Sequence, residues 1–245
     1  CSKGGVASGE ELLGVADTLS AARRLRRQID DPELRPVCTA LIATMATLPD
    51  LEQRLKCALE EGGRVADRAS PALAGLRQQW QRLRQERRDK LQELLRRLGS
   101  ALQDTVIAQR HGRPVLAVKA GAVGQVPGQV HDSSASGSTL FVEPRSVLTM
   151  GNRLVELESR IRDEERKVLA ELSAAVAEEH DPLTVVVQVL LQLDLALARG
   201  RYGRWLGGSI PRVETSTDAR FRFQGLRHPL LIWQQKKAGG PIVEP

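Results

Sequence analysis

The chain has 245 residues, 41% of them apolar and 27% charged, which is enough for one large domain or two small ones with a core. Seven residues are aromatic, whereas Leu, Ala, Arg, Gln and Glu dominate, so the composition favours helices and excludes an all-β sandwich. A net charge of +6 permits a nucleic acid or another acidic partner. The three cysteines have no C-x-x-C spacing, which argues against a disulfide framework and a zinc site, and we expect a cytoplasmic protein.

Capping residues predict three short helices in the N-terminal part. Ser8-x-x-Glu11 is a capping box, and Asp31-Pro32 and Asp50 each place a side-chain acceptor before an apolar run. The expected helices span about 9–30, 32–47 and 50–60, joined by short loops as in a helical bundle.

Two longer helices follow, near residues 70–98 and 145–180. Apolar residues recur at spacings of three and four in each, as in a coiled-coil seam: Leu73, Leu76, Trp80, Leu83, Leu91, Leu94 and Leu98 in the first, and Val147, Met150, Leu154, Leu157, Ile161, Val168, Leu172 and Val176 in the second. At 1.5 Å per residue these helices are roughly 40 to 50 Å long. They therefore exceed the size of a small bundle.

Between the long helices, short β-branched runs predict strands, and His111-Gly112 and Ala135-Ser136-Gly137 predict turns. A β element enclosed by two seam-bearing helices implies an arm, out along one helix and back along the other. We expect antiparallel helices 8 to 10 Å apart. Leu73 should then lie beside Val176, and Leu98 beside Val147.

The segment 181–206 is apolar nearly all round, which predicts a helix buried in the base of the molecule. Its longest apolar stretch, residues 183–198, is interrupted by polar residues and is too short to span a bilayer, so no membrane partner is expected. A basic connector, 207–245, follows and contains the strand-like run Arg220–Phe223.

The predicted fold class is mainly α: a helical core with a long antiparallel two-helix arm, capped by a small antiparallel β element. Six segments are expected along the chain: first part of the core, 1–69; outgoing helix, 70–98; β tip, 99–144; returning helix, 145–180; core helix, 181–206; and basic connector, 207–245.

The run from Val130 to Pro144, VHDSSASGSTLFVEP, resembles the signature of the second bacterial family of MutS proteins. Similar stretches are Gly4-Gly5-Val6, the run from Gly63 to Ser70, and the run from Arg113 to Lys119. The resemblance covers nearly the whole chain, and the run Arg227–Leu231 is similar to the entry of a MutS ATPase domain. It implies that the helical base is a core domain, the long helices are levers and the β tip is a clamp.

The resemblance also implies a larger parent protein, and the initial Cys1 agrees with that expectation. Such parents are ATP-dependent homodimers that act in recombination on branched DNA and in rescue on stalled ribosomes, often with a C-terminal Smr nuclease domain. ATP and Mg²⁺ would bind domains outside this chain, because the sequence has no G-x-x-x-x-G-K-[ST] loop. We expect no cofactor, metal site or catalysis in the chain itself.

The candidate nucleic-acid contacts are four residues of the β tip: Arg110, His111, Arg113 and Lys119. The first long helix carries eight basic and three acidic residues, a net +5, and its charges are expected mainly to pair with the acidic residues of the returning helix. Two alternatives stay open. The chain could be a coiled-coil tether or dimerisation module, or a hydrolase centred on His131, Asp132 and serines 133, 134, 136 and 138.

Overall fold

The structure, a computed structural model, describes residues 5–213, 215, 222–223 and 225–238. The chain forms two compact units. Residues 1–23 and 47–180 form the first, here called the arm unit, and residues 24–46 and 181–245 form the second, here called the C-terminal unit. The predicted mainly α fold with a small antiparallel sheet is confirmed. The finer division into six segments stays a prediction.

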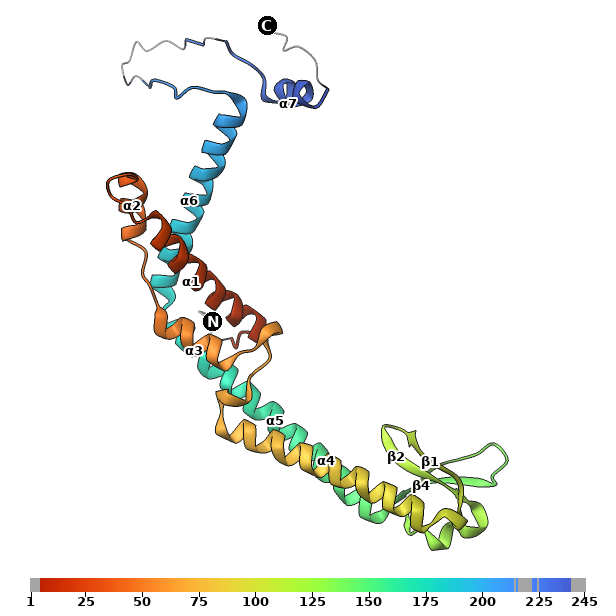
Figure 1. Cartoon of the computed structure of the whole chain (residues 1–245). Coiled ribbons are helices and arrows are strands. Elements are labelled where there is room, and N and C mark those ends of the chain that lie inside the picture. Colours follow the sequence, from red (N-terminus) through yellow and green to blue (C-terminus); the bar gives the residue numbers. More distant parts are fainter. Residues whose placement is uncertain (1–4, 214, 216–221, 224, 239–245) are drawn as a thin grey trace. The chain divides into compact units, whose positions relative to one another are not determined.

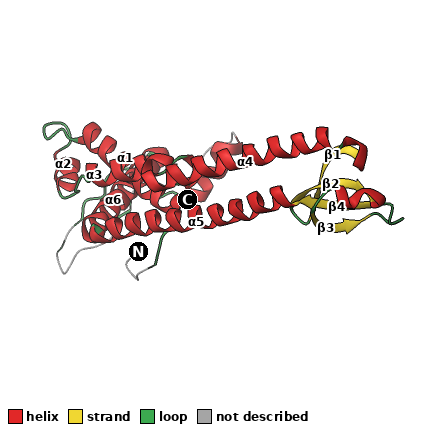
Figure 2. Cartoon of the chain, turned by 90° about the horizontal axis from the view of Figure 1, so that it is seen from below, coloured by secondary structure: helices red, strands yellow, loops and turns green. Residues whose placement is uncertain are grey.

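The arm consists of helices α4 (Pro71–Arg97) and α5 (Arg145–Glu178), which lie side by side and antiparallel (Figures 1 and 2). Helix α4 begins as predicted, because the Ser70 hydroxyl accepts a hydrogen bond from the Leu73 amide and Pro71 occupies the first helical position. Most seam residues are buried where the helices meet, including Leu76 on α4 and Leu157 on α5, whereas Trp80, Leu83, Met150 and Ile161 are partly buried.

The register of the two helices differs from the prediction. Ser70 Oγ donates to Glu164 Oε1 at 2.7 Å and Trp80 Nε1 donates to Glu158 Oε1 at 3.0 Å, so the first turns of α4 face the middle of α5. The predicted pairing of Leu73 with Val176 is therefore wrong. A heptad seam favours pairing but fixes the offset weakly, because each heptad presents a similar apolar surface.

Beyond the paired region, the last turns of α5 belong to the base of the arm unit. Val176 lines a cavity with Leu12 and Val15 of α1 (Gly9–Ile29), and the Ser173 hydroxyl accepts a hydrogen bond from the Ala7 amide at 3.0 Å. Helix α3 (Pro49–Ala58) packs against the same part of α5. The base thus holds α1, α3 and the end of α5.

At the other end, the arm carries a four-stranded antiparallel sheet in the order β1-β2-β4-β3. Its strands are β1 (Leu102–Arg110), β2 (Arg113–Lys119), β3 (Gly128–Ser133) and β4 (Thr139–Pro144). The predicted hairpin turn at His111-Gly112 is confirmed, with positive φ angles of 49° and 75° that match a type I′ turn. The register shifts once on β1 and once on β3, the two edge strands.

The sheet packs on the ends of both arm helices. Strand β1 reverses direction after α4 and runs back along it, and one apolar cluster joins the two helices to the strands. The cluster contains Leu91, Leu94, Leu102, Leu116, Val118, Val126, Val142 and Val147, with Leu98 packed against it. Leu98 and Val147 thus meet the same cluster, whereas their predicted direct pairing stays a prediction.

In the C-terminal unit, α2 (Pro36–Ala43) is shorter than the predicted helix at 32–47. Asp31 Oδ1 accepts a hydrogen bond from the Leu34 amide, which forms a turn before the helix. A helix that began at Pro32 would place Pro36 inside it, where the ring removes a backbone hydrogen bond. The second proline therefore sets the start of α2.

Helix α6 (His180–Leu206) forms as predicted, but its expected burial is wrong. Its buried residues are Val186, Val189 and Leu193, which lie along one face, whereas Leu191 and Leu197 are more than half exposed. An apolar circumference favours burial but supplies no packing partner. The expectation that this segment is too short and too polar to span a bilayer is also wrong, because α6 is the one helix of the described residues that is long and apolar enough to do so. By itself it is weak evidence for a membrane span, since the core helix of a soluble protein passes the same test.

Helix α7 (Pro229–Ala238) follows at the C-terminal side, where no helix was predicted. Its first turn is capped by His228 Nδ1, which accepts a hydrogen bond from the Leu230 amide at 3.3 Å. The predicted strand-like run at Arg220–Phe223 lies partly outside the described residues, and Arg222 and Phe223 have no regular secondary structure.

Candidate nucleic-acid interface

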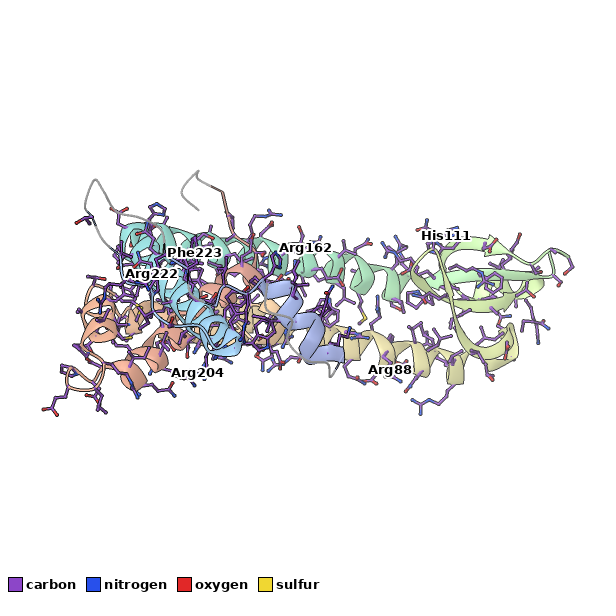
Figure 3. The ribbon with its side chains drawn as sticks, turned by 90° about the horizontal axis from the view of Figure 1, so that it is seen from above. Arg88, His111, Arg162, Arg204, Arg222 and Phe223 are labelled. Carbon is purple, nitrogen blue, oxygen red and sulfur yellow. The ribbon has the colours of Figure 1, made fainter. Side chains whose placement is uncertain are left out.

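The four predicted contact residues do not form one patch. Arg110, His111 and Arg113 surround the β1–β2 turn, at the end of the sheet that faces α5, and Figure 3 labels His111 there. Lys119 is at the opposite end of β2, about 20 Å away at 3.3 Å per residue, and its Nζ donates to the Ser100 carbonyl at 3.0 Å. Only one of the four thus lies at the far end of the arm.

Arg110 lies across one face of the sheet. Its guanidinium stacks over the Phe141 ring at 3.9 Å, and its Nε donates to Asp132 Oδ2 at 3.2 Å. Its other contact is with the backbone carbonyl of Gln109. The charge is therefore half-buried and already paired, which reduces its attraction for a phosphate.

Arg113 belongs to a polar cluster around the buried carboxylate of Glu143, which is 1% exposed. Its guanidinium lies 3.6 Å from Glu143 Oε1 and donates to Asn152 Oδ1 of α5 at 3.0 Å, while His131 Nε2 lies 2.8 Å from Glu143 Oε2. A side chain at Gly151 would press on this guanidinium, because its Cβ would lie 2.8 Å from it. The cluster ties β2, β3 and β4 to α5.

The serine-rich turn does not form the relay that a hydrolase needs. His131 contacts Glu143 and Asp132 contacts Arg110, and neither residue bonds a serine hydroxyl in this fully described segment. The serines bond one another and the backbone: Ser136 Oγ lies 2.8 Å from Ser138 Oγ, and the Thr139 amide donates to Ser134 Oγ. These contacts are those of a polar turn.

The basic charge of α4 pairs with α5 less than predicted. Arg77 forms an ion pair with Glu165 of α5 and another with Asp67, whereas the ion pairs of Lys90 and Arg97 are both with Glu93 on α4 itself. Within the described residues no ion pair closer than 4.0 Å involves Arg84, Arg87 or Arg88. The sequence predicted pairing here because α5 is acidic, but the acidic side chains face other groups.

These three arginines line a groove between α4 and the β1–β2 hairpin, with a volume of about 530 Å³. Its walls are Trp80, Gln81, Arg84, Gln85, Arg87, Arg88 and Leu91 of α4, with Ile107 of β1 and Pro114 of β2. The groove was not predicted, because it depends on β1 returning along α4. A spacing of four residues between Trp80, Arg84 and Arg88 was the signal that they share a helix face.

Cations crowd one another in this groove. Arg84 stacks over the Trp80 ring at 5.0 Å, and Arg87 is half-buried. Burial lowers the pKa of Arg87, and the Arg84 and Arg113 charges lower it further, against the opposing effect of Glu143 and Glu158. The groove is therefore a site where an anion would be stabilised.

Among the described residues, no group of three or more His, Cys, Asp and Glu side chains is arranged to hold a metal ion. Cys38 and Cys57 are free thiols.

Comparison with known proteins identifies relatives over almost the whole chain, although no family model matches it. It is 44% identical to Endonuclease MutS2 of Synechocystis over 99% of its residues, and 40% and 38% identical to Endonuclease MutS2 of Symbiobacterium thermophilum and of Pelotomaculum thermopropionicum over 94%. The chain spans about 30% of the length of these curated relatives. The predicted resemblance is thereby confirmed: over nearly all of its length the chain is similar to a part of proteins of MutS2, the second bacterial family of MutS proteins.

Proposed function

We propose that this chain is the arm with which a MutS2 protein clamps nucleic acid, either branched DNA or structured ribosomal RNA. The observation that carries the proposal is the paired α4–α5 arm with its sheet. Its outgoing helix has a net charge of +5, and three of its arginines line a groove and form no ion pair with any carboxylate that the structure describes. A long arm with a basic groove fits an extended polyanion better than a small substrate.

The proposal assigns the catalytic functions of the parent to domains outside this chain. In the proposal, ATP and Mg²⁺ bind other domains, which dimerise in the cytoplasm and close two arms around the partner. The endonuclease named in the relatives would likewise reside elsewhere in the parent. The chain would contribute binding without chemistry.

Binding of a labelled four-way DNA junction and a labelled hairpin RNA, measured by fluorescence anisotropy across a salt series, tests the proposal. If about three phosphates are neutralised, log K should fall with log salt at a slope near −3, without sequence preference. A stable dimer that binds neither probe at low salt would contradict the proposal and favour the tether. Ester turnover would favour the hydrolase.

A further inference from the structure

The β1–β2 hairpin and α4 enclose a groove whose charged lining is entirely cationic. Arg84, Arg87 and Arg88 line it, and no carboxylate of the part of the chain that the structure describes does. The carboxylates nearby are held by other groups: Glu158 accepts the Trp80 indole N–H, and Glu143 lies buried against His131 and Arg113. A bound anion would therefore meet three guanidinium groups and no competing negative charge in the lining.

The groove is also shaped to orient its cations. Trp80 holds the Arg84 guanidinium over its ring, and Arg88 follows one helical turn later, about 6 Å along the axis. Ile107 and Pro114 close the opposite wall and give the groove an apolar side. Planar guanidinium groups supported by an aromatic ring and by apolar walls are well suited to phosphate oxygens.

By contrast, the residues at the β1–β2 turn are engaged within the chain. Arg110 pairs with Asp132, and Arg113 bonds Asn152 and approaches Glu143. A phosphate that bound either of these guanidinium groups would have to replace an existing contact with Asp132 or Asn152. A phosphate bound to Arg84 or Arg88 would add an ion pair without displacing a carboxylate.

We infer that the groove lined by Arg84, Arg87 and Arg88 binds the phosphodiester backbone of the clamped nucleic acid. This inference rests on the proposed function and gives it a contact surface on the arm, between α4 and the β1–β2 hairpin. The contact is made to phosphates, so it carries no sequence preference and is the same for DNA and RNA.

The test uses two charge-matched double variants of the 245-residue chain. Arg84→Gln/Arg88→Gln removes two cations from the groove, and Arg82→Gln/Arg162→Gln removes two exposed arginines that do not line it; Figure 3 shows Arg88 on α4 and Arg162 on α5. Each lost phosphate contact should reduce the salt slope by about one. For both probes, the groove variant should change the slope of log K against log salt from near −3 to near −1. The control variant should keep a slope near −3.

A third variant, Arg84→Lys/Arg88→Lys, keeps both charges and should retain the wild-type slope, which separates loss of charge from misfolding. Equal losses in the groove and control variants would overturn the inference, as would an unchanged slope in the groove variant. In both cases wild-type binding would leave the proposed function intact. If the wild-type chain binds neither probe, the proposed function and the groove inference are both overturned. If polyglutamate displaces the probes at equal charge, the assignment to a phosphodiester backbone is overturned.

Discussion

Replacing Leu157 by Asp should unfold the arm and leave its base folded. Leu157 lies on α5 in the seam with α4 and is 2% exposed. Loss of its burial removes about 1.5 to 3 kcal/mol. The buried carboxylate adds several kcal/mol more. The total reaches the lower end of the stability of a whole domain, about 5 kcal/mol.

The expected result is local because the arm and its base are held by different contacts. The α4–α5 seam and the sheet cluster hold the arm, whereas α1, α3 and the last turns of α5 hold the base. Amide hydrogen exchange read by mass spectrometry should show lost protection in α4, the sheet and the first half of α5. Protection in α1 and α3 should persist.

Val155 provides the matched control, because it is two residues away on α5 and 54% exposed. Val155→Asp should leave exchange unchanged across the arm. Equal losses in both variants, or loss of protection everywhere at once in Leu157→Asp, would refute the view of the arm as a separate cooperative unit.

Substitutions at two further places and one ligand titration test other properties of the chain. Gly9→Ala should destabilise the base strongly, because the new Cβ would lie 1.8 Å from the Gly63 carbonyl oxygen. Gly14→Ala on the same helix meets nothing within 4 Å and should stabilise the base by about 0.5 to 1 kcal/mol. Urea denaturation compares the free energies of unfolding of the two variants. The hydrogen bond from Arg23 lowers the pKa of Glu52 to about 2, so its contribution to stability is complete above the ordinary pKa of 4.5 and is lost as the pH falls towards 2. Glu52→Gln should flatten the dependence of Tm on pH over that interval. Calorimetric titration with ATP should give no binding heat, because the sequence lacks the phosphate-binding loop.

Local signals in the sequence were sufficient for the starts of α1 and α4 and for the β1–β2 hairpin turn. The Ser8–Glu11 capping box forms in both directions, with the Ser8 amide donating to Glu11 and the Glu11 amide donating to Ser8. Ser70 caps α4, and the His111-Gly112 turn adopts the expected φ angles. These features depend on residues within four positions of each other, which is why the sequence alone could predict them.

Features that depend on pairing between distant segments could not be predicted in the same way. The offset of α4 against α5 is set by contacts such as Ser70 with Glu164, 94 residues apart. His131 reaches Glu143 because it lies where the β3–β4 register shifts, between Val130 and Asp132. The structural role of the family signature is therefore visible only once the register is known.

The groove on α4 illustrates the same limit for the candidate site. Sequence charge alone favoured neutralisation of the basic helix by the acidic one. The structure gives a single ion pair between α4 and α5, through Arg77 and Glu165, among the residues it describes. The rotation of a helix about its own axis decides which of its charged side chains meet those of its neighbour. The net charge of each helix gives no information about that rotation.

The register shifts on β1 and β3 have a consequence for solubility. These are the two outer strands of the sheet, and an outer strand exposes a row of unpaired backbone groups that another chain could join. An irregularity interrupts that row between Leu102 and Ile107 on one edge and between Val130 and Asp132 on the other. Each bulge bends and twists its strand, so neither edge offers a long flat template, and the sheet is protected against edge-to-edge aggregation.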